Sequence, residues 1–324
     1  MKWPRAATWL WLYVVCVLGA FGLAGGHLAH AAPDDVGRSV AVLYPELAEP
    51  YRSVLQAIIG GIDERVPGGA VRVPLAPQST AADLVSDLRR RDARVVVTLG
   101  RQGLRVARGL DRQFGVVASG VLAVTPADAE GLGVLSLAPD PGMLFARLRV
   151  LMPQVRRVRV VHDPSQNAWL IRLAREAART QGLELVVVEA TDLRAALRAY
   201  TDLLPQMNPQ QEALWLPQDS VTVDEDTVMP LVLREAWERN LHVFSSNVAH
   251  VRRGVLFALY PDNRALGRVL GDWARGYLQG GPLPPPGVQP LGELLLAVNT
   301  RTARHLGVSL AATQLKFNTV FPEP

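Results

Sequence analysis

The sequence predicts an α/β fold made of two Rossmann-like lobes, each built on a parallel sheet with helices on its faces. From Ser39 onward, short β-branched runs alternate with longer segments of helical period, which is the pattern of a parallel sheet covered by helices. The runs are mostly apolar at every position, as strands buried on both faces should be. They are too numerous for one ordinary sheet, and the alternation restarts after a loop-rich stretch at residues 124–140, so we expect two sheets.

Short strands and four clear helices account for most of the chain. The expected strands are residues 39–43, 70–73, 95–99, 115–119, 157–162, 183–188, 213–216, 242–245, 255–259 and 294–298. The expected helices are residues 143–152, 167–180, 228–239 and 262–278. Asp140-Pro141 gives the first of these helices its cap, and Thr222 with Glu225 forms a capping box ahead of the third. The acidic run at residues 224–226 then lies in a first helical turn, where carboxylates meet the helix dipole.

We expect the chain to cross between the lobes three times. Residues 32–137 and 257–300 are assigned to lobe one, and residues 138–256 and 301–324 to lobe two. The helix at 262–278 should therefore pack on the N-terminal sheet. Residues 281–290 are rich in proline and glycine, which predicts a surface loop or, as an alternative, a docking site for a proline-reading module.

The N-terminus, residues 1–31, has the features of a secretory signal peptide. Lys2 and Arg5 supply positive charge, the next segment is nearly all apolar, and Ala29-His30-Ala31 fits a small-x-small cleavage site. We therefore expect a periplasmic protein whose signal peptide is cleaved near Ala31. A transmembrane anchor is the competing interpretation, because the apolar run approaches spanning length.

The composition argues against several kinds of chemistry. Cys16, the only cysteine, lies within the predicted signal, so the mature chain has no disulfide and no thiolate. A net charge of +4 is too small to indicate nucleic-acid binding. The sequence has no phosphate-binding loop, zinc-protease motif or nucleophile elbow, and the mature histidines show no metal-ligand spacing. We interpret His162 and His242 as partly buried structural residues. The protein is thus predicted to have no catalytic residue, no metal and no cofactor, and not to be an enzyme.

Polar residues follow many of the predicted strands directly. In open α/β sheets the ligand crevice lies at the carboxyl ends of the strands, so these positions form a candidate ligand-binding site. A single such residue is more often a helix cap, but a set drawn from both lobes favours a binding cleft. The candidate ligand-binding residues are Tyr44, Arg101, Gln102, Asn167, Asp219, Ser220, Asn247 and Asp262.

The segment at residues 253–262, Arg-Gly-Val-Leu-Phe-Ala-Leu-Tyr-Pro-Asp, and the following Leu266-Gly267-Arg268 resemble one family. That family is the ABC-transporter substrate-binding proteins of the type I periplasmic-binding fold, in the group linked to tryptophan and tyrosine uptake. Leu296-Ala297-Val298-Asn299 resembles the closing strand of the same family. The resemblance implies a monomeric periplasmic protein that closes on a small molecule and delivers it to an ABC permease in the inner membrane.

Two departures from the family pattern affect the expected ligand. Gly100-Arg101-Gln102 stands where the family often has a small or hydroxyl residue, proline and alanines, and Ser246-Asn247 stands where an acidic residue is usual. An acid there would suit an α-ammonium group, so its replacement favours an anionic or neutral ligand over an amino acid. An orphan ligand sensor that signals to a membrane partner is the alternative function.

Overall fold

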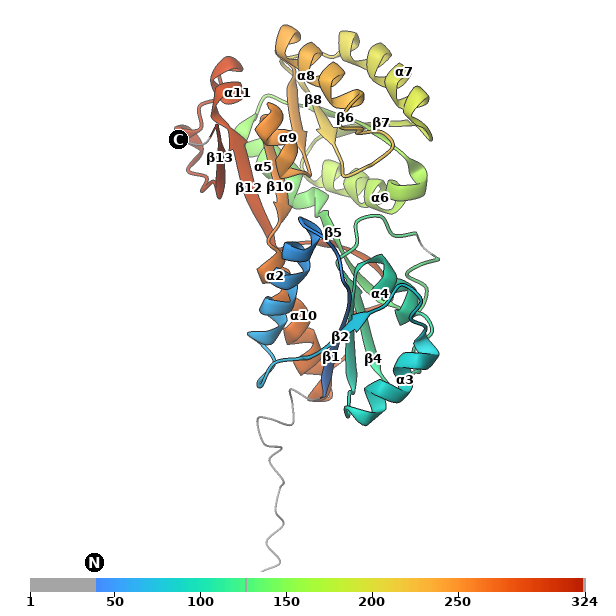
Figure 1. Cartoon of the computed structure of the whole chain (residues 1–324). Helices are drawn as coiled ribbons and strands as arrows, with labels where there is room; N and C mark the ends of the chain where they lie inside the picture. Colours follow the sequence, from blue (N-terminus) through green and yellow to red (C-terminus); the bar gives the residue numbers. More distant parts are fainter. Residues whose placement is uncertain (1–38, 126, 323–324) are drawn as a thin grey trace, which may run out of the picture. The chain divides into compact units, whose positions relative to one another are not determined.

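The computed structural model describes residues 39–125 and 127–322, which fold into two sheets with interleaved helices (Figure 1). The predicted signal peptide, its cleavage site and the competing membrane anchor lie outside the described residues. None of the helices in the described part is long and apolar enough to span a membrane. The predicted α/β class with two parallel sheets is confirmed.

Lobe one is built on a six-stranded sheet in which every neighbouring pair is parallel, in the order β11-β5-β4-β3-β1-β2. Its strands are β1 (Val40–Pro45), β2 (Val71–Leu75), β3 (Val95–Leu99), β4 (Gly115–Ser119), β5 (Gly133–Pro139) and β11 (Gly287–Leu291). Its helices are α2 (Tyr51–Asp63), α3 (Ala81–Arg90), α4 (Gly100–Ala107) and α10 (Asn263–Leu278).

Lobe two is built on a seven-stranded sheet in the order β13-β12-β10-β9-β8-β6-β7, and only the pair of β10 and β12 is antiparallel. Its strands are β6 (Arg157–His162), β7 (Glu184–Glu189), β8 (Glu212–Leu216), β9 (His242–Ser245), β10 (Phe257–Pro261), β12 (Leu294–Asn299) and β13 (Thr319–Phe321). Its helices are α5 (Pro141–Leu151), α6 (Pro164–Thr180), α7 (Leu193–Leu203), α8 (Val228–Arg239), α9 (Val248–Arg253) and α11 (Thr300–His305), with short 3₁₀ turns at Leu204–Gln206 and Ala311–Thr313.

Each sheet is covered on both faces, as the alternation of strands and helices requires. In lobe one, α2 and α10 cover the face that carries Val40, Val42 and Val97, whereas α3 covers the face that carries Ala41 and Leu43. In lobe two, α5 and α6 pack on one face of the sheet and α7 and α8 on the other. Strands buried on both faces explain why the strand sequences are apolar at nearly every position.

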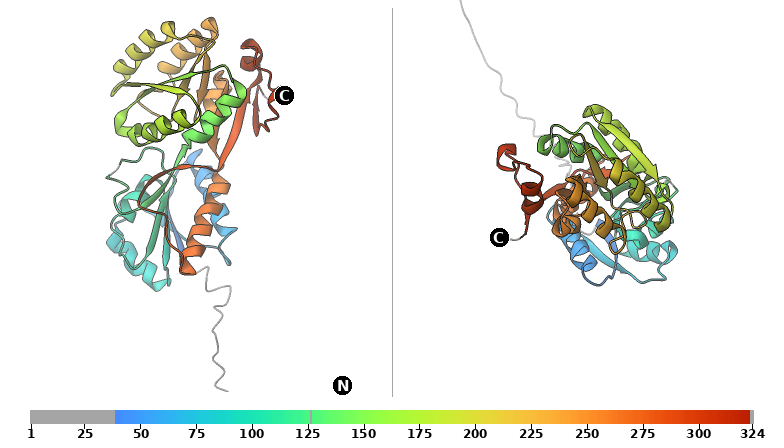
Figure 2. Two further views of the ribbon diagram at one scale, coloured as in Figure 1. Left: turned by 180° about the vertical axis from the view of Figure 1, so that it is seen from behind. Right: turned by 90° about the horizontal axis from the view of Figure 1, so that it is seen from above.

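Helices α2 and α10 lie side by side in both lateral views (Figures 1 and 2). Glycines make this approach possible, because a Cβ added to Gly267 would lie 2.0 Å from the carbonyl oxygen of Ile58 and 2.8 Å from the Cα of Gly61. A Cβ added to Gly61 would meet the carbonyl oxygen of Arg264 at 2.1 Å. The helix predicted at 262–278 therefore packs on lobe one, as expected, through backbone contact with α2.

All ten predicted strands are present within two residues of the expected bounds, but three further strands were missed. Strand β5 lies in the stretch 124–140 that was expected to be a loop, and β11 lies in the predicted surface loop at 281–290. Both lack a long β-branched run, and β11 contains a proline, which is tolerated because the strand lies at the edge of its sheet. The third, β13, has only three residues.

Strand pairing also corrects the division of the chain between the lobes. Strands β10 and β12, which were assigned to lobe one as part of 257–300, belong to the sheet of lobe two. The sequence of an apolar strand does not indicate which sheet the strand joins. The crossings therefore fall at Pro139–Asp140, Pro261–Asp262 and residues 291–294, where the N–H groups of Asp140 and Asp262 donate to the carbonyls of Leu291 and Glu293, both at 2.9 Å.

The predicted capping box ahead of α8 is wrong. The hydroxyl of Thr222 donates to the carbonyl of Val161 instead, and the helix begins only after Thr227. The carboxylate of Asp224 accepts from the N–H groups of Asp226 and Thr227, whereas Glu225 turns toward α9. The segment is a loop ordered by long-range contacts, which local sequence spacing does not encode.

Candidate functional site

Two loops that follow strands of lobe two, those after β6 and β8, are linked by one carboxylate, that of Asp219. Its Oδ2 accepts from the N–H of Asp163 at 2.7 Å and from the side-chain amide of Asn167 at 2.9 Å. Its Oδ1 accepts from the N–H groups of Val221 at 3.0 Å and Thr222 at 2.9 Å. Asp219 is 5 % exposed, so these bonds form away from bulk water. Two of the predicted site residues, Asn167 and Asp219, are thus in direct contact, and the loop after β6 is fixed to the loop after β8.

Asp163 reinforces the same junction from the start of α6. Its carboxylate caps the helix by accepting from the N–H and the hydroxyl of Ser165 and from the amide of Gln166. Burial acts to raise the pKa of Asp163, but the hydrogen bonds from Ser165 and Gln166 outweigh it and hold the pKa below its usual value. The side-chain oxygen of Gln166 in turn accepts from the hydroxyl of Ser220 at 3.2 Å. Ser220, a third predicted residue, therefore joins this cluster.

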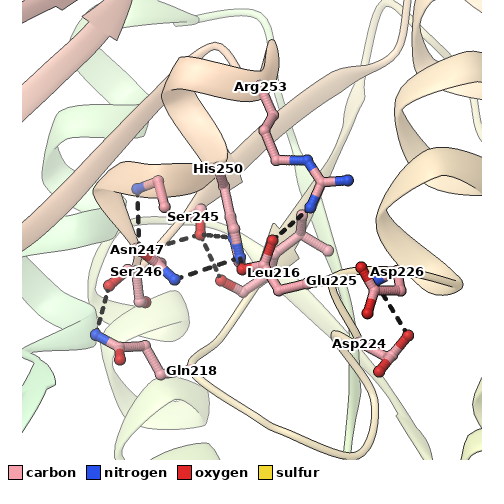
Figure 3. Close-up of polar contacts among 11 residues, drawn as sticks. Leu216, Gln218, Asp224, Glu225, Asp226, Ser245, Ser246, Asn247, His250 and Arg253 are labelled. Carbon is pink, nitrogen blue, oxygen red and sulfur yellow. Dashed lines mark hydrogen bonds and ion pairs between the residues drawn. The ribbon is translucent and has the colours of Figure 1, made fainter. Parts of the chain in front are cut away.

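The loop after β9 is tied to the loop after β8 by a hydrogen bond from a side-chain amide to a main-chain carbonyl. The amide of Gln218 donates to the carbonyl of Ser246 at 2.8 Å, a bond drawn in Figure 3. Asn247, the predicted residue in this loop, caps α9 by accepting from the N–H of Ala249 at 2.9 Å. The strand-end loops of β6, β8 and β9 thus form one continuous polar edge of lobe two.

Behind this edge, His250 connects Ser245 to Glu225 (Figure 3). Its Nδ1 lies 2.8 Å from the Ser245 hydroxyl and its Nε2 lies 3.0 Å from Oε1 of Glu225. Burial lowers the pKa of His250, so the ring is neutral near pH 7 although Glu225 opposes this effect. We assign the single proton to Nε2, which donates to the carboxylate. The one proton of the Ser245 hydroxyl has two acceptors within reach, Nδ1 and the carbonyl of Leu216 at 3.1 Å. Glu225 also forms an ion pair with Arg253.

The order of these three groups, hydroxyl, imidazole and carboxylate, is also that of a hydrolase relay. Ser245, however, is fully buried within β9, and its oxygen already accepts from the N–H of Asn247 at 3.0 Å. A nucleophile must reach its substrate. The three groups therefore bind the loop at residues 217–227 to α9. This role of Glu225 was not predicted, because Glu225 was assigned to a capping box.

The predicted residues of lobe one are less closely connected. Tyr44 lines a cavity of about 580 Å³ together with Glu46, Arg52 and Arg72, and every residue in its wall belongs to lobe one. Arg101 is exposed, its guanidinium approaches the carbonyl of Ala123 at 3.5 Å, and its charge helps to lower the pKa of Asp128. In contrast, the amide of Gln102 donates to the carbonyl of Ala76 and is held by the fold.

Asp262 lies at one of the crossings between the lobes. Its carboxylate caps α10 by accepting from the N–H of Ala265 at 2.9 Å. The structure thus joins Asn167, Asp219 and Ser220 into one cluster with Asn247 on the adjoining loop, and it places Tyr44, Arg101, Gln102 and Asp262 elsewhere. A cleft shared by all eight residues stays a prediction.

Metal-ligating groups and histidines outside these loops are the other candidates for chemistry. In residues 39–125 and 127–322, no group of three or more histidine, cysteine, aspartate or glutamate side chains is arranged to hold a metal ion. His162 and His242 are 2 % and 5 % exposed, hence more deeply buried than predicted, and burial lowers the pKa of both. Sequence reasoning missed the roles of Glu225 and His250 because the two residues are 25 positions apart and no local pattern joins them.

Comparison with solved structures places this two-lobed architecture among type I periplasmic-binding folds. The ABC domain in complex with L-Trp from Streptococcus pneumoniae has 16 % identity and a TM-score of 0.54, with 87 % of this chain and 100 % of that chain covered. The ligand-free, open form of a substrate-binding protein with adhesive properties from Clostridium difficile has 14 % identity and a TM-score of 0.63, covering 87 % and 99 %. A probable maltose operon transcriptional repressor from Staphylococcus aureus has 12 % identity and a TM-score of 0.50, covering 83 % and 99 %. At these identities the likeness shows the fold alone.

The family is decided by sequence. No curated protein matches the chain at a significant level. The family model described as ABC transporter substrate binding protein matches residues 146–319, which is more than half of the chain and includes the whole polar edge of lobe two. The chain therefore belongs to the ABC transporter substrate-binding protein family.

Proposed function

We propose that the protein is exported to the periplasm, binds a small molecule between its two lobes as a monomer, and delivers it to an ABC permease in the inner membrane. Family membership supports a small-molecule ligand and a permease partner. The three crossing segments are suited to hinge closure, in which a few residues at element ends absorb the motion. We also infer that the protein acts by binding and not by catalysis.

The observation that carries this proposal is the continuous polar edge formed by the loops after β6, β8 and β9. Parallel strands bring their carboxyl ends to one edge of a sheet, and ligands of open α/β folds bind there. Hydrogen bonds through Asp219 and Gln218 hold the three loops in fixed positions. Fixed polar groups on rigid loops allow a small ligand to be bound without a large cost in ordering them.

The state of the carboxylates favours a ligand without an ammonium group. The carboxylate oxygens of Asp219 and Asp163 accept hydrogen bonds from the chain itself, and those of Asp262 and Asp224 cap turns or helices. Glu225 is paired with Arg253. Arg101, in contrast, has no ion pair with any described residue, and its guanidinium could bind an anionic oxygen. An anionic or neutral polar molecule therefore fits these residues better than an α-amino acid.

Mass spectrometry of the molecule released from natively purified, then denatured protein identifies the ligand directly. Thermal-shift screening of aliphatic and aromatic amino acids, nucleosides and small organic anions provides an independent route. A ligand at 100 times its dissociation constant should stabilise the protein by about 2.7 kcal/mol. Chemical alteration of the bound molecule during incubation would contradict a purely binding function.

Substitution of Arg101 tests the predicted ligand class. If the ligand is anionic, Arg101→Gln should raise its Kd at least tenfold, because a charge-assisted hydrogen bond is lost. Arg105→Gln is the matched control, since it removes the same charge one turn further along α4, and it should change the Kd less than twofold. Equal Kd values for both variants and the parent would remove Arg101 from the site.

Cellular uptake separates transport from sensing. A strain that lacks this protein should lose uptake of the identified ligand, and re-expression of the protein should restore it. Normal uptake combined with loss of a ligand-induced response would support the alternative ligand sensor.

A further inference from the structure

A second cavity, of about 630 Å³, lies in lobe two and is lined by basic and aromatic side chains. The last turns of α8 and α9, the start of α11 and the end of β13 form its wall. Its basic and aromatic lining residues are Arg234, Trp237, Arg252, Arg253, Arg301 and Phe321.

This basic cavity is at the opposite end of lobe two from the polar edge. Helix α8 leads into β9 and so runs antiparallel to the strands, which brings its last turn to their amino ends. Strand β12 is antiparallel to β10, so Asn299 and the start of α11 reach the same end. A ligand in the basic cavity would therefore occupy a site separate from the one proposed at the polar edge.

Four arginines line the basic cavity, and none of the described residues in its wall, which ends at Pro322, carries a carboxylate. Arg253 is neutralised by Glu225, and Arg234 approaches Glu235 only at 3.6 Å. Arg252 and Arg301 make no hydrogen bond or ion pair with any residue in the described part of the chain. Like charges gathered at one cavity repel one another, and a bound anion would relieve that repulsion.

Aromatic rings hold the two unpaired guanidinium groups. The guanidinium carbon of Arg252 lies 5.5 Å from the ring centre of Phe321, and that of Arg301 lies 5.4 Å from the ring centre of Trp237. Stacking on a ring restrains the guanidinium plane and leaves its edge N–H groups free to donate. Trp237 is itself 42 % exposed, so the cavity also presents an apolar surface.

We propose that the basic cavity binds the phosphate group of an organic phosphate, either a soluble phosphate ester or a phospholipid headgroup. Phosphate oxygens accept bidentate hydrogen bonds from arginine forks, and several oxygens can engage more than one guanidinium. The cavity is larger than an inorganic ion requires and so has room for the organic part of the ligand. His305 is stacked on the Trp237 ring and the Arg301 guanidinium lies over it, so the organic part would contact the edge of the ring, not its face.

Two probes distinguish the two sources of the phosphate group. Isothermal titration calorimetry with phenyl phosphate, at constant ionic strength, tests a soluble ester. Co-sedimentation with vesicles of phosphatidylglycerol and phosphatidylcholine, compared with phosphatidylcholine alone, tests a headgroup. Binding in either assay supports the proposal, and the assay that responds identifies the source. If the protein binds neither probe, the proposal is wrong.

Paired substitutions locate the binding. Arg252→Gln combined with Arg301→Gln should weaken the observed binding at least tenfold. Arg194→Gln combined with Arg198→Gln removes the same charge from two exposed arginines of α7 in the same lobe and should change binding less than twofold. Arg301→Gln alone, whose guanidinium lies over Trp237 without a hydrogen bond or ion pair to any described residue, provides a variant that keeps the fold if the double variant does not. Equal weakening by both pairs would show a non-specific charge effect and overturn the assignment.

Discussion

Removal of the Asp219 carboxylate should destabilise the folded protein strongly. In Asp219→Ala, four donors lose their acceptor: the N–H groups of Asp163, Val221 and Thr222 and the amide of Asn167. Asp163, Asn167 and Thr222 are at most 5 % exposed, so water does not reach these donors freely in the intact protein.

The size of the effect follows from the net value of these bonds. A hydrogen bond to a charged group contributes about 1.5–3 kcal/mol, and a buried donor without an acceptor costs about 1–3 kcal/mol. Water that enters the space left by the carboxylate will satisfy some of the four donors. We therefore expect the free energy of unfolding to fall by about 3–5 kcal/mol, which is less than the full sum.

Urea unfolding at pH 7.5, followed by far-UV circular dichroism, measures this loss. Asp192→Ala is the matched control because Asp192 caps α7 through one N–H, that of Ala195, and its removal should cost about 1 kcal/mol. Similar losses for the two variants would show that Asp219 is an ordinary cap and would refute the reasoning. The structure thus makes Asp219→Ala unsuitable as a clean test of ligand binding, for which Arg101 is the better position.

Three further predictions concern other parts of the fold. Gly267→Ala should destabilise the protein by about 3 kcal/mol in urea unfolding, because its Cβ would meet the Ile58 carbonyl. Gly276→Ala, on the same helix with open space around it, should stabilise the protein by up to about 1 kcal/mol. A Gly267→Ala variant as stable as the parent would contradict the close contact. Glu212→Gln should lower the free energy of unfolding by about 2–3 kcal/mol, because Glu212 is 3 % exposed and binds Arg157 and Arg159. Glu176→Gln, which breaks an exposed pair with Arg179, should lower it by less than about 0.5 kcal/mol. Burial lowers the pKa of His162, His242 and His250, so the unfolded chain takes up protons first as the pH falls. The free energy of unfolding should therefore decrease from pH 7.5 to 5.5, and it should decrease less in His250→Gln. A free energy of unfolding that does not change with pH would be inconsistent with buried neutral rings.

The fold was predictable from the sequence where the pattern of apolar residues within a single segment is enough to identify a strand or helix. Runs such as Val95–Leu99, in which Thr98 is the one polar residue, are apolar on both faces because both faces are covered, and they were placed correctly. Strand β11 was missed because Pro290 and the preceding prolines indicate a loop, and only pairing with β5 makes the segment a strand. The assignment of β10 to a sheet likewise depends on its partners β9 and β12, which the local sequence does not reveal.

The candidate site was predictable as a set of positions but not as a set of contacts. The rule that ligands bind at strand ends selected Asn167 and Asp219, which the structure brings within 2.9 Å of each other. The same rule could not show that Asp219 serves four donors of the chain, because those donors come from two different loops. Glu225 was assigned to a helix cap, although its partner His250 lies on another helix.

The carboxylates of lobe two have a structural role that limits their use in ligand binding. Carboxylates at the polar edge are used to hold loops in place, since Asp163 and Asp219 accept hydrogen bonds from the chain itself. A carboxylate that already serves buried N–H groups would leave them unpaired if it turned to a ligand, and each unpaired group would cost about 1–3 kcal/mol. We therefore expect ligand contacts from groups with spare hydrogen-bonding capacity, such as the Arg101 guanidinium of lobe one. Anionic and neutral ligands should therefore be tested before amino acids, because the carboxylates that would bind an ammonium group are already used by the chain.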